Sequence, residues 1–158
     1  MEFVPGSFVY QLLLFLHVVS AVILLGPFYV GPVLAKLRGD PPSPLILQAE
    51  AAICRYGAAF FVIALVTGGA LIGVSPSTKD GGFKTAHWLH LGIALWFVAA
   101  GVLTGYITPR VRKAQAAAEG GEGAEVKRLL APVDTVAGPL VGALGAVIVY
   151  LMLAKPSF

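Results

Sequence analysis

Charged residues are scarce in this sequence. Only 12% of the 158 residues are charged, about half the usual quarter, whereas 58% are hydrophobic and the mean hydropathy is +0.86. So few charged side chains cannot cover the surface of a soluble domain of this size, which excludes a water-soluble fold. Four windows contain no Asp, Glu, Lys or Arg at all: residues 3–35, 56–78, 85–109 and 135–154. Each window reaches the length of about 20 residues that a membrane-spanning helix needs.

Cysteine is nearly absent too. Because Cys54 is the only one, an internal disulfide and a cysteine-based metal motif are both excluded. The excess of eleven bases over eight acids does not indicate nucleic acid, because membrane proteins concentrate bases in their cytoplasmic loops. Composition therefore predicts the lipid bilayer as a partner, and no nucleic acid.

The charge-free windows predict an all-α membrane protein, an antiparallel four-transmembrane-helix bundle that forms a single transmembrane domain over residues 1–158. Its spans are expected at about 8–34, 48–74, 86–107 and 135–154. Between the third and fourth spans, a glycine- and alanine-rich stretch at 114–125 is predicted to be a mobile loop.

The distribution of Lys and Arg predicts the orientation. Eight bases lie in or next to the connections after the first and third spans: Lys36, Arg38, Arg55, Arg110, Arg112, Lys113, Lys127 and Arg128. The other side has only Lys79, Lys84 and Lys155. Because bases favour the cytoplasmic side of a membrane, both termini are predicted to lie outside.

Glycines four residues apart predict how the spans pack. The pairs are Gly69 with Gly73, Gly101 with Gly105, and Gly138 with Gly142. In lipid, small residues let two helix backbones approach closely and gain van der Waals contact. We expect these pairs to lie at contacts within the bundle, and a homodimer face is the alternative.

Acids and lysines are absent from the charge-free windows, where the only ionisable side chains are His17, His87 and His90. Proton-coupled transporters and intramembrane hydrolases usually need an acid, so this absence counts against both classes.

Glu50 is interpreted as solvating the start of the second helix. Asp134 is interpreted as an acid favoured by the N-terminus of the fourth.

Two of these histidines suggest a haem site. His17 and His90 are expected in the outer half of the membrane, on spans that run in the same direction. Imidazole is the usual axial ligand of haem iron. The sequence therefore predicts haem b bound by His17 and His90, with His87 as a fallback ligand. Apolar neighbours that would suit the porphyrin faces are Leu16, Leu89, Trp96 and Phe97. Structural histidines, or a metal or quinone site, are the alternatives.

Two segments carry a resemblance to known proteins: Leu16-His17-Val18-Val19-Ser20-Ala21-Val22-Ile23-Leu24-Leu25-Gly26 and Met152-Leu153-Ala154-Lys155-Pro156. With them the chain resembles a family of small four-span bacterial integral membrane proteins of unknown function. The pairs Leu16-His17 and Leu89-His90 are distantly similar to those of copper-resistance D-like and protoporphyrinogen-oxidase-like membrane proteins. The resemblance implies a multi-pass protein of the prokaryotic plasma (inner) membrane. It also implies haem binding, copper binding or redox chemistry at His17 and His90.

Three functions follow as hypotheses. The first is a small b-type cytochrome-like protein that transfers electrons through a haem held between spans one and three, near the outer face. The second is a non-catalytic accessory subunit of a larger respiratory or transport complex. The third is a metal or small-molecule transporter. No catalytic residue is assigned, and the sequence leaves open whether the chain is an enzyme.

Overall fold

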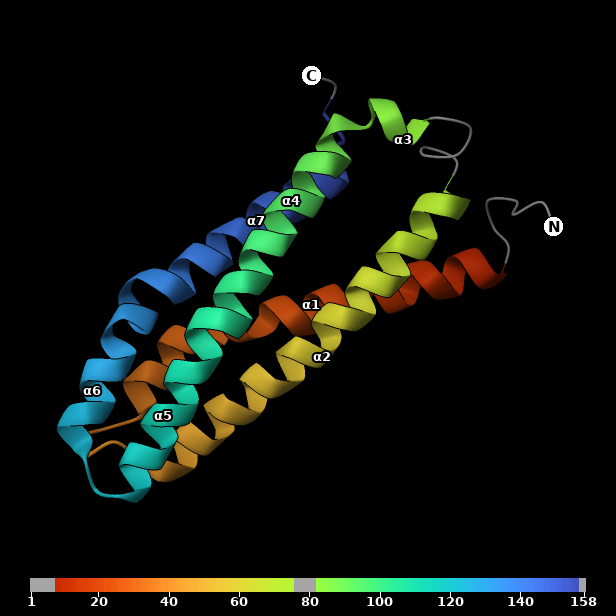
Figure 1. The fold of residues 1–158 in the computed structure, drawn as a ribbon. Helices are drawn as coiled ribbons and strands as arrows, with labels where there is room; N and C mark the ends of the chain where they lie inside the picture. Colours follow the sequence, from red (N-terminus) through yellow and green to blue (C-terminus); the bar gives the residue numbers. More distant parts are fainter. Residues whose placement is uncertain (1–7, 76–81, 157–158) are drawn as a thin grey trace.

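Every element in the described part of the chain is helical. The computed structural model describes residues 8–75 and 82–156, and these contain no strand (Figure 1). Residues 1–7, 76–81 and 157–158, and with them Lys79, lie outside the described residues. In chain order the elements are α1 (Phe8–Leu37), α2 (Pro44–Val74), α3 (Gly82–Thr85), α4 (His87–Gly101), η2 (Val102–Ile107), α5 (Thr108–Glu119), α6 (Gly123–Pro132), η3 (Val133–Ala137) and α7 (Gly138–Ala154), where η denotes a π-helical segment.

The helices confirm that this is a multi-pass membrane protein. Four helical runs in the described residues are long and apolar enough to span a membrane: Phe8–Leu37, Pro44–Val74, His87–Glu119 and Gly123–Ala154. The third and fourth runs are longer than predicted. The helix continues past Thr108-Pro109 and past Pro132: η2 immediately precedes Thr108-Pro109, and η3 immediately follows Pro132. In a membrane, local π adjustments help to satisfy the backbone groups near a proline.

The prediction of a mobile loop at 114–125 is wrong. Helix α5 continues to Glu119 and α6 begins at Gly123, so only a short turn joins them. The alanines of this stretch are strong helix formers, and Ala114 and Val126 are buried at the contact between α5 and its neighbours. The turn contains Gly121 at φ +76°, a left-handed conformation that favours glycine.

The four long helices form two pairs. Helix α1 packs along α2, and α4 packs along α7. The pairs meet at the lower end of Figure 1, where α2 packs on α5 and η2, and α1 packs on α7 and η3. Toward the upper end, where α2 ends and α4 begins, the pairs diverge (Figure 1). The most deeply buried large side chains are Leu47, Val126, Leu130 and Val141.

The predicted glycine contacts are wrong within this chain at four of the six positions. A Cβ atom would meet nothing within 4 Å at Gly69, Gly73, Gly101 or Gly105. Close approaches occur at other glycines. A Cβ on Gly92 would lie 2.9 Å from Met152 Cε, and one on Gly145 would collide with Leu25. The alternative of a homodimer face stays a prediction.

Candidate functional site

An ionic cluster lies at the lower end of the molecule, where three elements meet. Arg38 follows α1, Glu50 lies on α2 and Asp134 lies in η3. Arg38 Nε donates hydrogen bonds to Glu50 Oε1 at 2.8 Å and to Glu50 Oε2 at 3.1 Å. Arg38 Nη2 donates to Asp134 Oδ1 at 3.0 Å, and Nη1 donates to Asp134 Oδ2. The side chains of Arg38 and Glu50 are only 11% and 8% exposed, whereas that of Asp134 is 30% exposed.

The cluster forms the polar end of a cavity. The cavity has a volume of about 210 Å³, and its walls are otherwise mainly apolar. Residues from α1, α2, η2, η3 and α7 contribute to these walls. They include Leu24, Leu34, Ile53, Cys54, Leu103 and Val133.

Both π-helical segments contribute to this cavity. Leu103 and Ile107 line it from η2, and Val133 and Asp134 line it from η3. Short π-helical segments are rare, and they occur frequently at functional sites. Within a membrane, irregular backbone is tolerated where it is buried in protein or lines a cavity. Two irregular segments from different helices therefore frame one cavity.

The cluster has more negative than positive groups. Arg38 is the only cation among the described residues that line the cavity, and Glu50 and Asp134 are the two carboxyls. Burial opposes the charged form of the guanidinium, but the hydrogen bonds and attraction of Asp134 and Glu50 outweigh burial and raise the pKa of Arg38 above its ordinary value. Arg38 therefore stays protonated. When both carboxylates are ionised, the cluster carries one net negative charge.

An aromatic stack lies next to the cavity, toward the diverging ends of the helix pairs. Phe61 on α2 and Trp96 on α4 stack with ring centroids 3.6 Å apart and planes 15° from parallel. These rings line a second cavity of about 20 Å³, which shares Leu24 and Leu103 with the larger one. A molecule that entered from the upper end would pass the stack before it reached the ionic cluster.

Sequence reasoning missed this cluster and misinterpreted two of its members. Glu50 does not solvate a helix start, because it is buried against Arg38. Asp134 is not at the start of a helix, because α6, η3 and α7 form one continuous run. Glu50 is therefore a buried acid, and the supposed absence of buried acids no longer counts against a transporter. Arg38 binds partners 12 and 96 residues away, so no local sequence pattern marks the cluster.

The predicted haem ligand His17 packs against α2. Its Nδ1 lies 3.0 Å from the carbonyl oxygen of Ala64 and 3.3 Å from Thr67 Oγ1. A carbonyl oxygen only accepts, so Nδ1 carries the proton, and in the neutral ring Nε2 is the unprotonated nitrogen. Gly68 provides the space, because a Cβ there would lie 2.9 Å from His17 Cε1. His17 therefore contributes to the packing of α1 on α2.

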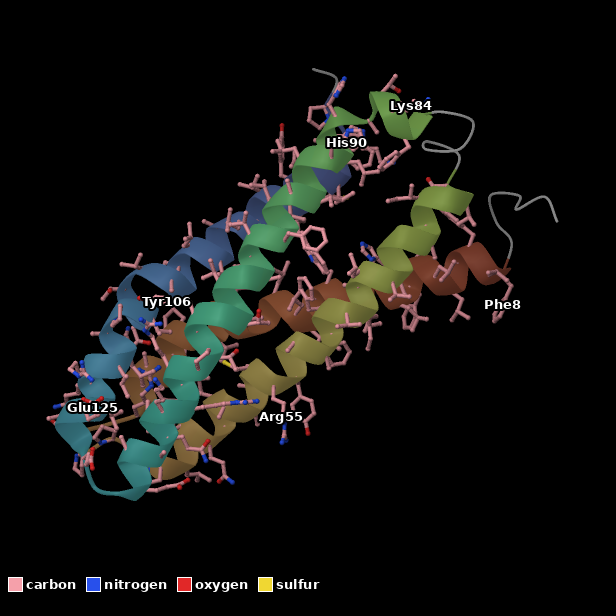
Figure 2. All side chains as sticks on the ribbon, viewed as in Figure 1. Phe8, Arg55, Lys84, His90, Tyr106 and Glu125 are labelled. Carbon is pink, nitrogen blue, oxygen red and sulfur yellow. The ribbon has the colours of Figure 1, made fainter. Side chains whose placement is uncertain are left out.

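The predicted ligands His87 and His90 lie in the first turn of α4. Figure 2 shows His90 near the upper end of the molecule. The ring of His90 meets Phe83 edge-on with centroids 4.6 Å apart, and the exposed His87 ring is 6.3 Å from it. Helix α4 packs mainly on α7, whereas α1 packs mainly on α2 and α7. The helices of His17 and His90 are therefore not principal neighbours. Among the described residues, no group of three or more His, Cys, Asp or Glu could hold a metal ion.

Comparison of the chain with protein-family models, with curated proteins and with solved structures finds no match. The candidate site consequently rests on the residues and contacts described above.

Proposed function

We propose that this protein is a small-molecule transporter whose substrate binds in the cavity, with a polar group against Arg38, Glu50 and Asp134. One observation carries the proposal: a largely buried ionic cluster lies at one end of an otherwise apolar cavity. Ionisable groups are costly in a membrane protein, and apolar side chains could provide the same packing without that cost. An apolar cavity with a few convergent polar groups is the usual form of a small-molecule site.

The proposal includes an orientation. We take the chain as an antiparallel four-helix bundle in a prokaryotic plasma (inner) membrane, with both termini outside. The bases after the first and third spans support it, because they lie at the end that holds the cluster, as Arg55 does in Figure 2. The cavity is then in the inner half of the membrane. Substrate would arrive from outside past Phe61 and Trp96, and would leave on the side of Asp134.

Cys54 supplies the test, because it is the only cysteine of the chain and lines the cavity. The protein in lipid vesicles is treated with methyl methanethiosulfonate, and disulfide formation at Cys54 is followed by mass spectrometry. Three molecules of matched size compete: benzyltrimethylammonium, N-benzylacetamide and 3-phenylpropionate. We expect at least one of them to slow the labelling, since a cavity of about 150 Å³ already accepts benzene.

Two tryptophan variants locate the protection. Ile53→Trp fills the cavity and should abolish protection, whereas Val66→Trp, on the exposed face of the same helix, should retain it. Uptake of the protecting molecule into vesicles should be lost in Ile53→Trp and retained in Val66→Trp, which extends the test from binding to transport. If no molecule slows labelling of the folded parent protein, the transporter proposal fails and the accessory-subunit hypothesis takes its place.

A haem-binding function has one specific observation in its favour, and we propose it as the second candidate. Histidines that bind a metal usually donate their other ring N–H to a carbonyl or carboxylate, as His17 does to Ala64. Haem b held by His17 and His90 would supply one-electron transfer. Protein from cells supplied with haem precursors should then show a low-spin six-coordinate spectrum. His17→Ala and His90→Ala should abolish it and His87→Ala should keep it, whereas a colourless parent protein would exclude haem.

A further inference from the structure

We infer that the molecule bound in the cavity is an amphipathic monocation, with one apolar group and one ammonium-like head. The inference rests on the proposed function, because it concerns the same cavity. It specifies which charge the cavity selects. Three independent features support it: the charge of the ionic cluster, the volume of the cavity and the nature of its walls.

With both carboxylates ionised, the ionic cluster has one negative charge more than Arg38 compensates. Glu50 and Asp134 share the single guanidinium of Arg38, and the Nε, Nη1 and Nη2 atoms all donate to them. Other charged side chains at this end are outside the cavity lining, such as Lys127, which pairs with the exposed Asp40. A bound monocation would make the buried assembly neutral. A neutral molecule would leave one uncompensated charge, and an anion would leave two, which costs more in a medium of low dielectric constant.

The volume limits the size of the molecule. About 210 Å³ is somewhat larger than the cavity of about 150 Å³ that accepts benzene, so one aromatic ring with a small cationic head fits. The walls suit the ring, because Leu24, Ile53 and Leu103 are apolar.

The charge preference is measured by protection of Cys54 in the full chain in vesicles. In the parent protein, benzyltrimethylammonium should protect at a concentration at least about tenfold lower than N-benzylacetamide, and 3-phenylpropionate should protect least. The charge of benzyltrimethylammonium is permanent, so the comparison does not depend on its protonation. Ratios taken within one variant also cancel any change in the reactivity of the thiol.

Two variants assign the preference to the cluster. Glu50→Gln removes the excess negative charge, so the preference for the cation should fall by at least about fivefold. Asp134→Asn should act in the same direction, and it covers the case in which Glu50→Gln does not fold, because Asp134 is the less buried of the two. Lys127→Gln changes the charge at the same end of the molecule outside the cavity and should keep the parent's preference.

The outcomes separate the two proposals. Equal or better protection by N-benzylacetamide or 3-phenylpropionate would overturn the monocation inference and leave the cavity as a binding site. A cation preference that survives in both Glu50→Gln and Asp134→Asn would also overturn it. Lack of protection by all three molecules would overturn the proposed function itself.

Discussion

At the scale of single residues, Arg38 connects the helices that meet at the lower end of the molecule. Its planar guanidinium holds one carboxylate from α2 and one from η3, so a single side chain joins three segments that are distant in sequence. Nη1 and Nη2 contact Asp134 as a bidentate pair, whereas the single Nε–H is shared by the two carboxylate oxygens of Glu50. Lysine cannot reproduce this geometry. The cluster is therefore sensitive to loss of its one cation.

Removal of that cation should destabilise the protein strongly. Arg38→Gln leaves Glu50 and Asp134 without a counter-charge in a poorly solvated site, and we expect a loss of about 3–5 kcal/mol in the free energy of unfolding. Lys127→Gln breaks the exposed pair with Asp40 and should cost less than about 1 kcal/mol. The free energy of unfolding of both variants is measured in mixed micelles by increasing the fraction of a denaturing detergent. Equal stability of the two variants would contradict a buried, mutually dependent cluster.

Neighbouring glycines on α2 should differ in their tolerance of a methyl group. Gly68→Ala places a Cβ 2.9 Å from His17 Cε1 and should displace that ring, with a loss of about 1–3 kcal/mol. Gly69→Ala meets nothing within 4 Å and should keep or slightly raise the melting temperature, because alanine is the better helix former. The melting temperatures of Gly68→Ala, Gly69→Ala and the parent protein in detergent test this difference. A larger loss in Gly69→Ala would indicate that Gly69 is covered in a homodimer.

At the scale of elements, the sequence predicts the spans far better than their ends. A membrane-spanning helix must be apolar over about 20 residues, so the absence of charge reveals four helices directly. The ends near Pro109 and Pro132 were not predictable, because a proline usually stops a regular α-helix, whereas here the helix continues through a π-helical segment next to each of these prolines. Whether such a segment forms depends on how the neighbouring helices pack, which no local pattern records.

The order of α5 and α6 predicts where proteases cut. A protease that cleaves after glutamate should cut at Glu119 or Glu122, beside the turn, several-fold faster than trypsin cuts after Lys113 in the interior of α5. Cleavage requires local unfolding of the chain, which is easier at a turn than inside a packed helix. Mass spectrometry of the fragments over time gives the two rates, with the denatured chain as the control. Comparable rates in the folded protein would restore the predicted mobile loop.

At the scale of the whole molecule, the two helix pairs explain why the candidate site was only partly accessible to sequence reasoning. Histidines stand out in a charge-free window, so the sequence predicts His17 as a haem ligand, which stays a prediction; the structure places its ring in a defined contact with α2. The ionic cluster depends on the meeting of the α1–α2 pair with the α4–α7 pair at one end. Its residues lie at the margins of the windows, where charged side chains are expected in any membrane protein. Only their convergence distinguishes them.

Orientation is the property of the whole molecule on which the direction of transport depends, and two cysteine variants can determine it. In a Cys54→Ala background, Glu122→Cys places a thiol on the α5–α6 turn, and Lys84→Cys places one on α3 at the opposite end. Both positions are exposed. If the base-rich end faces the cytoplasm, a membrane-impermeant maleimide added to intact spheroplasts should label Lys84→Cys and leave Glu122→Cys unlabelled until the membrane is broken. Labelling in the reverse order would place the ionic cluster in the outer half of the membrane, and substrate would then enter from the cytoplasm past the Phe61–Trp96 stack.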